Sequence, residues 1–557
     1  MAMSTSVPTE GGPPVPPPAE RHDRSLVELL DDLPALDDTI VVHSTAGTLS
    51  HAGLRAAVSA VADALTRAGV GPGHPVGALV GSGMTGVVAM FAVWTVGAVY
   101  MPINRRSTGR EVADLLADTP VSLLLGTAPD LAELAGFAEP AELAELDRQT
   151  GLLGEPREPR ELGELGLVEL DETEWSATVR RPASAPAAAY DGDIALVLRT
   201  SGTTGKPKAV LLRHRSTIDA LDSSLRKLRR RGPAPREKRP TIRVNLIPLS
   251  LALWSGIFNT LFSLRAGFGV VLLDRFTPPV FAAAVHTHRL KSTVLAPAMI
   301  TMLCDSDEID TLEPLEIVRS ITAPLSPATA RRFHERFGVL VLNSYGQTEL
   351  GGEVVGWTIE DIRSFGTEKL GAAGRPYDDV DLRVLDENDE DVALGELGHI
   401  HIRSPFRMRG YAAADGSPEP PDDDRIVDGF LRTGDIGRMD ADGFLWIEGR
   451  VSDMINRGGL KIFPDEVEEV LRRHPSVRDA AVAGVPDGRL GEVPHAWIVP
   501  QSGEIDAAAL EAWCRERLVA YKVPVAFAVV ETMPRSDVGK LLRRQLRATV
   551  APPEVTL

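Results

Sequence analysis

One stretch of the sequence reads Thr200-Ser201-Gly202-Thr203-Thr204-Gly205-Lys206-Pro207-Lys208, and it comes directly after a predominantly apolar run at 194–198. An apolar run of this length is typical of a buried strand. Glycines and hydroxyl side chains after a strand let the backbone turn and present N–H groups to an anion, and the lysines add positive charge. The stretch therefore predicts a phosphate-binding loop.

This loop differs from the Walker-type phosphate loop, in which Gly-Lys-Ser/Thr leads into a helix. Here Gly205-Lys206 is followed by Pro207 and Lys208, and then by the strand-like residues 209–212. We therefore expect a loop between two strands. The competing interpretation is an ordinary solvated turn rich in Gly, Thr and Lys, which is a poorer explanation for nine consecutive residues placed after a buried strand.

Length and composition exclude several classes of protein. The chain has 557 residues, too many for one compact core, so we expect at least two domains. The formal net charge is −19, from 59 Lys and Arg against 78 Asp and Glu, which argues against a nucleic-acid-binding surface. Only Cys304 and Cys514 are present, and neither belongs to a zinc-like pattern. Two isolated thiols indicate a reducing compartment, so we expect a cytoplasmic protein.

Neither the start of the chain nor its most apolar segment indicates a membrane protein. Residues 1–24 are rich in Pro, Gly, Ser and Thr, and we expect a disordered tail there. The most apolar segment, 86–101, is shorter than the ~20 residues that a spanning helix needs. We therefore expect a buried helix and no membrane span.

Residues 200–208 closely resemble the signature of the adenylate-forming superfamily, which includes acyl-CoA synthetases, peptide-synthetase adenylation domains and luciferases. Further stretches resemble other motifs of that superfamily in the same order: 317–326, 343–349, 429–435, 456–464 and 534–541. The resemblance implies an α/β fold in which a large N-terminal domain, with two mostly parallel sheet lobes and a small β-subdomain, carries a mobile α+β lid domain. We expect the boundaries to be 25–448 for the N-terminal domain, 449–453 for the hinge and 454–557 for the lid.

The resemblance also implies an ATP site. Its expected ATP- or AMP-binding residues are Thr200, Ser201, Gly202, Thr203, Thr204, Gly205, Lys206, Lys208, Ala323, Asn343, Tyr345, Gly346, Asp435 and Arg450. A flat Tyr345 ring can stack on adenine, and Asp435 can accept hydrogen bonds from both ribose hydroxyls. Relatives commonly carry two glycines where this chain has Ile321 and Thr322, so we expect the backbone path beside Ala323 to differ slightly.

Three residues are expected to carry the chemistry. By resemblance Lys540 enters the site from the C-terminal domain, Thr348 donates to the α-phosphate, and Glu349 offers a hard oxygen to Mg²⁺. The reaction joins two anions, a carboxylate and ATP, so catalysis must consist of positioning and charge neutralisation. Loss of Lys540 should therefore slow adenylation.

The second half-reaction would use other residues. The turn at Gly458 and Gly459, with Lys461, resembles the place where CoA-using relatives pass pantetheine, and Ser452 stands at the pivot where relatives often carry a charged residue. For Lys540 to withdraw and this turn to approach, the C-terminal domain would rotate about Ser452.

The expected acyl pocket departs from the family pattern. Many relatives carry a histidine where this chain has Leu251, and we assign Leu251 and Trp254 to the acyl pocket. No Asp or Glu occurs between residues 244 and 273, so nothing there could hold the ammonium of an α-amino acid. An α-amino acid substrate is therefore disfavoured.

We expect ATP-dependent formation of an acyl-adenylate with release of pyrophosphate, followed by transfer to a thiol, with CoA favoured. The alternatives are transfer to a carrier protein, transfer to an amine or activation of an unusual oxyacid, and, from another class, a nucleotide-binding regulator without catalysis. The basic run 226–239 fits a solvated loop or a docking patch for CoA phosphates or an acidic carrier. The identity of the acid and the oligomeric state stay open.

Overall fold

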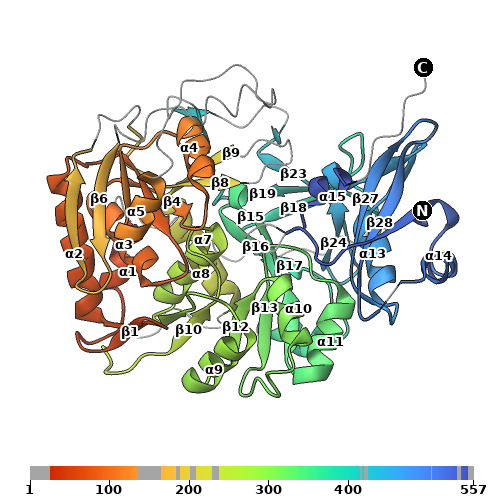
Figure 1. The fold of residues 1–557 in the computed structure, drawn as a ribbon, viewed down its shortest axis with the longest axis horizontal. Coiled ribbons are helices and arrows are strands. Elements are labelled where there is room, and N and C mark those ends of the chain that lie inside the picture. The colour runs from red at the N-terminus through yellow and green to blue at the C-terminus, as the bar shows by residue number, and fades with distance from the viewer. Residues whose placement is uncertain are drawn as a thin grey trace, which may run out of the picture.

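The computed structural model describes residues 25–135, 165–183, 189–200, 208–228, 238–413, 417–419, 425–503, 505–535 and 541–549. The fold is α/β, as expected from the sequence. A large N-terminal part contains several sheets, and a smaller C-terminal part, drawn in blue in Figure 1, is built on one sheet.

The largest sheet has nine strands in the order β21-β20-β9-β8-β4-β3-β5-β6-β7. Its strands are β3 (Pro75–Val80), β4 (Val99–Asn104), β5 (Leu123–Thr127), β6 (Gly166–Asp171), β7 (Ser176–Arg181), β8 (Ile194–Thr200), β9 (Lys208–Arg213), β20 (Gly410–Ala412) and β21 (Pro418–Glu419). β3 pairs in parallel with β4 and β5 and is buried throughout. Successive residues of a strand face opposite sides, and accordingly Val76 and Leu79 belong to different core clusters. This sheet is covered on both faces.

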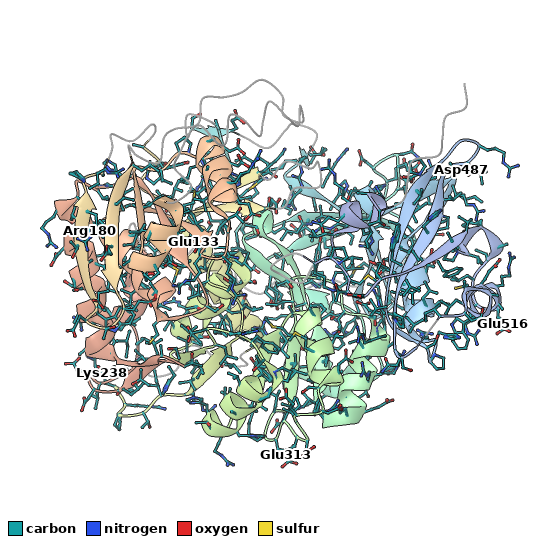
Figure 2. The ribbon with its side chains drawn as sticks, viewed as in Figure 1. Glu133, Arg180, Lys238, Glu313, Asp487 and Glu516 are labelled. Atoms are coloured by element: carbon teal, nitrogen blue, oxygen red, sulfur yellow. The ribbon has the colours of Figure 1, made fainter. Side chains whose placement is uncertain are left out.

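Helices of the N-terminal region complete these cores. They are α1 (Glu28–Asp31), α2 (His51–Arg67), α3 (Met84–Thr95), α4 (Gly109–Asp118) and α5 (Ala128–Ala135). α3 is buried along its whole length except at Thr95, as a helix that is apolar on all sides must be. Among the described residues, no helix combines the length and the apolar character needed to cross a membrane. Figure 2 shows the charged side chains of Arg180, Glu313 and Glu516 at the outer edge of the molecule.

A second group of strands forms the middle of the molecule. One sheet has the order β10-β11-β1-β2 and another has β12-β13-β14. The bounds are β1 (Ile40–Ser44), β2 (Gly47–Ser50), β10 (Val244–Ile247), β11 (Gly269–Leu272), β12 (Ser292–Leu295), β13 (Ile317–Ser320) and β14 (Leu340–Asn343). The accompanying helices are α7 (His214–Leu228), α8 (Trp254–Arg265), α9 (Pro278–His288), α10 (Pro297–Asp305) and α11 (Pro327–Phe337). β12, β13 and β14 are parallel, so their carboxyl ends lie at one edge.

Two smaller antiparallel sheets follow along the chain. The first contains β15 (Tyr345–Gln347), β16 (Gly352–Gly356) and β17 (Arg375–Pro376), with the 3₁₀ helix η2 (Thr348–Leu350) and α12 (Ile359–Phe365) nearby. The second contains β18 (Asp381–Leu385), β19 (Gly398–Arg403), β22 (Ile426–Val427), β23 (Phe430–Met439) and β24 (Leu445–Arg450). The second sheet is the antiparallel subdomain predicted from the alternating residues at 380–385 and 398–402.

The C-terminal part begins after a short 3₁₀ helix, η4 (Val451–Asp453). Its sheet contains β25 (Ile455–Arg457), β26 (Leu460–Ile462), β27 (Val477–Asp487), β28 (Gly491–Pro500) and β29 (Ala526–Val529). The helices are α13 (Pro464–Arg472), α14 (Ala507–Arg515) and α15 (Arg543–Arg547), with the 3₁₀ helix η5 (Ala520–Lys522). The sheet has a hydrophobic cluster of its own. This is the property that a separate lid domain requires, although the domain boundaries themselves stay predictions.

Candidate active site

The expected phosphate-binding loop joins two antiparallel strands. β8 ends at Thr200 and β9 begins at Lys208, and these two residues are direct partners in the ladder. The Thr200 hydroxyl donates to the Lys208 carbonyl oxygen at 3.4 Å, and Lys208 Nζ lies 4.8 Å from the centroid of the Tyr411 ring. The residues between them, Ser201, Gly202, Thr203, Thr204, Gly205, Lys206 and Pro207, lie outside the described residues, as does Lys540.

A buried carboxylate joins two sheets at the centre of the candidate site. The side chain of Asp435 on β23 is only 3% exposed. Its Oδ2 accepts hydrogen bonds from Tyr345 Oη at 2.6 Å and from Gln347 Nε2 at 2.8 Å, and its Oδ1 lies 2.9 Å from Arg450 Nε. A buried charge needs such partners. The structure therefore brings together three predicted site residues that are up to 105 positions apart in the chain.

The strand geometry explains this meeting. Asp435 and Arg450 are direct partners across the β23–β24 ladder, so their side chains lie on the same face. Tyr345 follows the carboxyl end of parallel strand β14, where ligands bind in open α/β sheets. Gln347 is two residues further along β15 and shares the face of Tyr345.

Charge and burial set the protonation states of this cluster. Burial and the neighbouring Asp435 raise the pKa of Tyr345 well above its ordinary value, so the phenol stays a hydrogen-bond donor at neutral pH. Burial lowers the pKa of Arg450, but Asp435 and the other acidic neighbours outweigh this effect and the net shift is upward. A carboxylate can accept about four hydrogen bonds. With three already made, Asp435 has room for one more donor before Tyr345 or Gln347 must give way.

Glu349 and Thr348 lie on η2, directly after β15. Glu349 is half-buried, and within the described part of the chain its carboxylate makes no hydrogen bond or ion pair. No three His, Cys, Asp or Glu side chains of the described residues gather into a metal site. A single carboxylate suits Mg²⁺ when phosphate and water oxygens supply the other ligands, so Glu349 fits the role expected of it.

Two glycine-related positions shape the backbone here. Gly346 pairs with Glu353 across β15 and β16, and a Cβ at Gly346 would collide with the backbone of Gly352. Thr322, next to half-buried Ala323, has a φ of 78°, a conformation that glycine adopts readily and a β-branched residue rarely does. The chain therefore follows a glycine-like path at Thr322 while carrying a side chain there.

Asn343, at the end of β14, holds neighbouring loops together. Its Nδ2 donates to the carbonyl oxygens of Leu325 at 3.3 Å and Gly371 at 3.1 Å. Its Oδ1 is buried and has no partner among the described residues. Asn343 therefore fixes the backbone beside Tyr345 and keeps one acceptor unused.

The residues expected to bind CoA form a tight turn in the C-terminal part. Gly458 and Gly459 connect β25 to β26, both with positive φ (59° and 90°), and both are exposed. Lys461 forms an ion pair with Glu387 of the β18–β19 connection, which belongs to the N-terminal part. Ser452 lies exposed in η4, between the sheets of the two parts.

The two residues assigned to the acyl pocket differ in environment. Leu251 is buried, and a Cβ at Gly86 of α3 would touch its side chain. Trp254 begins α8; its ring centroid is 5.5 Å from that of Phe258, and its buried Nε1 has no partner among the described residues. Leu251 thus packs into the core, whereas Trp254 keeps an unused donor.

The ends of the basic run 226–239 are tied to the protein. Arg226 pairs with Asp379 at 2.6 Å, and Lys227 Nζ donates to the carbonyl oxygen of Pro376 at 3.0 Å. The Arg239 backbone bonds with Pro34 and Leu36. The run is therefore not a freely solvated loop at these ends, while residues 229–237 lie outside the described part.

Two groups of functional interest were not predicted. Gln347 stands inside the motif 343–349, and its position two residues after Tyr345 on a strand was an available signal. Arg319 and Glu353 form an ion pair of 2.8 Å beside the candidate site. No local pattern indicated this pair, because its members are on different strands far apart in sequence.

Sequence comparison finds two family models along the chain. The model described as AMP-binding enzyme matches residues 32–412, and that described as AMP-binding enzyme C-terminal domain matches residues 466–540. A feruloyl-CoA synthase of Amycolatopsis sp. is 31% identical over 515 residues, which are 91% of this chain and 96% of that protein. A 2,3-dihydroxybenzoate–AMP ligase of Bacillus subtilis is 33% identical over 362 residues, 64% of this chain and 65% of the relative.

Solved structures agree with this result. The o-succinylbenzoate CoA synthetase of Bacillus subtilis, in complex with the acyl-adenylate intermediate OSB-AMP, superimposes with a TM-score of 0.74 at 27% identity. The match covers 94% of this chain and 98% of that structure. The two chains therefore share their architecture over nearly their whole length.

Proposed function

Because the chain belongs to the AMP-binding enzyme family of adenylate-forming ligases, we propose that it activates a carboxylic acid with ATP, as acyl-adenylate with release of pyrophosphate, and then transfers the acyl group to CoA. The observation that carries this proposal is the cluster of Tyr345 and Arg450 around the buried Asp435, with Glu349 near enough to help raise the pKa of Arg450. It combines an aromatic ring, a ribose-type acceptor, a cation and a metal-type ligand in one place.

In the first half-reaction the acid's carboxylate oxygen attacks the α-phosphorus of ATP, and the bond to pyrophosphate breaks. Asp435 accepts a ribose hydroxyl, Tyr345 stacks on the base, and Thr348 donates to the α-phosphate. Glu349 would hold Mg²⁺, which neutralises phosphate charge when bound. Lys540 and the loop 200–208 bring further positive charge to the reacting oxygens.

For the second half-reaction we propose that the C-terminal domain turns about Ser452. The exposed Gly458-Gly459 turn would then approach the adenylate and admit the thin pantetheine chain. The ion pair between Lys461 and Glu387 would have to open, and an ion pair this exposed to water contributes little to stability. Support for the proposal is that the contact is weak and that Ser452 is exposed.

A second acceptor also has specific support. Leu251 replaces the histidine common in relatives, and one relative is named an AMP ligase without mention of CoA. We therefore keep transfer to a carrier protein or an amine as the alternative. A nucleotide-binding regulator is the non-enzymatic alternative.

The two cysteines are free and buried, which supports a reducing, cytoplasmic setting.

The test is pyrophosphate release from ATP with aliphatic and aromatic acids, each with and without CoA. We expect acid-dependent release, thioester formation only with CoA, and at least a hundredfold loss of release in Lys540→Ala. The control is Lys291→Ala, which removes an exposed lysine paired with Glu316 and should leave the rate unchanged. A regulator would bind ATP and release neither pyrophosphate nor AMP, and an unchanged rate in Lys540→Ala would remove Lys540 from the mechanism.

A further inference from the structure

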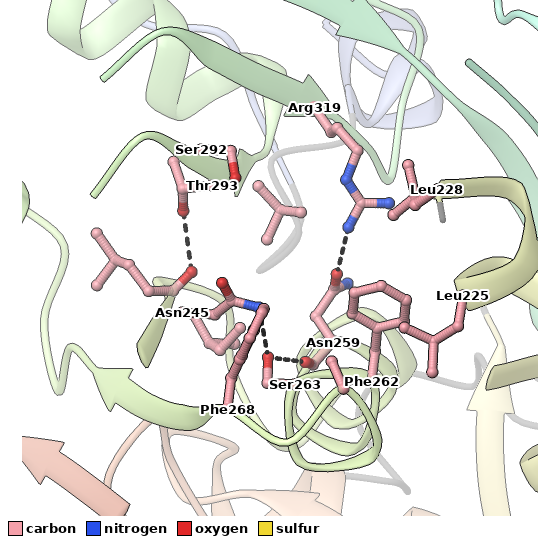
Figure 3. A pocket seen from close by; sticks show the side chains of 14 residues that line it. Leu225, Leu228, Asn245, Asn259, Phe262, Ser263, Phe268, Ser292, Thr293 and Arg319 are labelled. Carbon is pink, nitrogen blue, oxygen red and sulfur yellow. Dashed lines mark hydrogen bonds between the residues drawn. The ribbon is translucent and has the colours of Figure 1, made fainter. Parts of the chain in front are cut away.

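A cavity of about 240 Å³ lies between α7, α8 and strands β10, β12 and β13 (Figure 3). Much of its wall is apolar. Side chains that make this wall include Leu225, Leu228, Ile247, Phe262, Phe268 and Val294. A buried apolar cavity of ~150 Å³ holds benzene, so this one has room for a substituted ring.

Of the described residues, the charged side chain that lines the cavity is Arg319 on β13. Its two terminal nitrogens bind Glu353 at 2.8 Å and the Asn259 side-chain oxygen at 3.0 Å. Figure 3 shows the guanidinium of Arg319 reaching toward Asn259 on α8. An arginine has five N–H groups, so N–H donors remain available toward the cavity.

The charge of Arg319 is already compensated. Glu353 also accepts hydrogen bonds from Ser344 at 3.0 Å and Tyr377 at 2.5 Å. Burial and the neighbouring Glu353 raise the pKa of Tyr377 well above its ordinary value, so Tyr377 stays a donor. Glu353 is therefore an anion that accepts three hydrogen bonds beside Arg319. A second carboxylate entering the cavity would meet its repulsion, whereas a neutral polar group would not.

The other polar groups of the wall leave an acceptor unused. Asn245 Nδ2 donates to Ser263 Oγ at 3.1 Å, and Ser263 Oγ donates to the Asn259 carbonyl oxygen at 2.7 Å. The Thr293 hydroxyl donates to the Leu246 carbonyl oxygen at 2.9 Å. The side-chain oxygen of Asn245 has no hydrogen bond within the described part of the chain. The cavity thus offers donors from Arg319 and one acceptor from Asn245, which together suit a hydroxyl group.

This cavity adjoins the candidate nucleotide site. Glu353 pairs with Gly346 across β15 and β16, and Ser344, which donates to Glu353, directly precedes Tyr345. A molecule with its carboxylate near Tyr345 could therefore extend its far end past the Arg319–Glu353 pair. Glu353 thus links Arg319, which lines the cavity, to the strand that carries Tyr345, whereas Leu251 and Trp254 do not line this cavity.

We propose, on the basis of the proposed function, that the substrate is a carboxylic acid that contains a ring. This acid carries a neutral hydroxyl group at the end away from its carboxylate. Arg319 and Asn245 recognise that hydroxyl group, and the compensated charge of Arg319 rejects a second carboxylate. Arg319 and Asn245 are thus specificity-determining residues for the adenylation step.

The test compares benzoic and phenylpropenoic acids that carry hydrogen, hydroxyl or carboxylate at the para position. Wild-type kcat/KM for pyrophosphate release should be at least fivefold higher for the hydroxyl acid than for the unsubstituted acid, and lowest for the dicarboxylate. Arg319→Met with Glu353→Gln keeps the pair neutral and should abolish the preference, and Asn245→Val should reduce it. Arg332→Met, which removes an arginine paired with Asp305 outside the cavity, is the control and should retain the preference.

The outcomes separate this inference from the proposed function. Turnover that is equal for all substituents, or unaffected by the Arg319 and Asn245 variants, overturns the inference and leaves the function standing. Absence of turnover with every acid, together with calorimetric binding of the hydroxyl acid that depends on Arg319, overturns the function and supports the inference. Absence of both turnover and binding overturns both.

Discussion

Replacing Asp435 with asparagine tests the centre of the candidate site. The change keeps the size of the side chain but removes its charge and turns one acceptor oxygen into a donor. In the protein three donors already face the carboxylate, from Tyr345, Gln347 and Arg450, so one acceptor position remains for a ribose hydroxyl. The hydrogen bond that ATP would make there is one to a charged group.

A hydrogen bond to a charged group contributes about 1.5–3 kcal/mol, and each 1.4 kcal/mol changes affinity tenfold. Asp435→Asn should therefore raise the KM for ATP about 10- to 100-fold. Pyrophosphate release at a fixed acid concentration, with ATP varied, measures this effect. Calorimetric titration with a non-hydrolysable ATP analogue should give the same ratio.

The matched control is Asp389→Asn. Asp389, in the connection between β18 and β19, makes an exposed ion pair with Arg432 of β23 at 2.7 Å, and its positive φ of 62° suits asparagine. This variant should bind ATP like wild type. If Asp435→Asn has a wild-type circular dichroism spectrum and an ATP KM within twofold of wild type, Asp435 does not bind the ribose and the assignment of the nucleotide site is refuted.

Two further predictions concern stability. Thr322→Gly should raise the free energy of unfolding of the N-terminal part by ~1 kcal/mol in urea titrations, because the strain of a β-branched residue at φ 78° exceeds the chain-entropy cost of glycine. Thr322→Ala keeps a Cβ and should raise this free energy by less. Equal increases in the two variants would contradict the strain at Thr322. His214 is buried and accepts the Leu26 N–H at Nδ1, and burial lowers its pKa from 6.5 to about 4. Neutral His214 therefore stabilises the protein above pH 6.5, and this contribution of ~3 kcal/mol is lost as the pH falls toward 4. His214→Gln should lose correspondingly less stability between pH 7 and 4, and parallel wild-type and variant curves would refute this.

Much of the fold could be predicted because its signals are local. The apolar run at 194–198, the antiparallel partner after the glycine-rich stretch and the all-apolar segment of α3 each depend on residues adjacent in the chain. Strand and helix periodicity, and the conformations that glycine permits, act over a few residues. The order of the motifs then led to the family, which the comparisons show.

The candidate site was predicted as a set of residue types, without their contacts. Tyr345, Asp435 and Arg450 each stood in a recognisable motif. The position of Gln347 placed it on the same strand face as Tyr345, but no local pattern indicated that it would bind Asp435, which is 88 residues away. The expectation that Asp435 could accept from both ribose hydroxyls took no account of partners inside the protein. Three of its four acceptor positions are occupied by side chains from β15 and β24, which only folding brings near.

By itself, then, the sequence determined the α/β class, the connection between β8 and β9, and the residue types proposed for the nucleotide site, because each depends on residue type and short-range spacing. Only the tertiary structure decided what surrounds each group. Arg319 binds Glu353 and Asn259, and these contacts join three elements up to 94 residues apart. Glu353 compensates the positive charge of Arg319 where Arg319 lines the cavity. Hydrogen bonding and burial depend on distances in space, and the spacing of residues along a chain does not contain those distances.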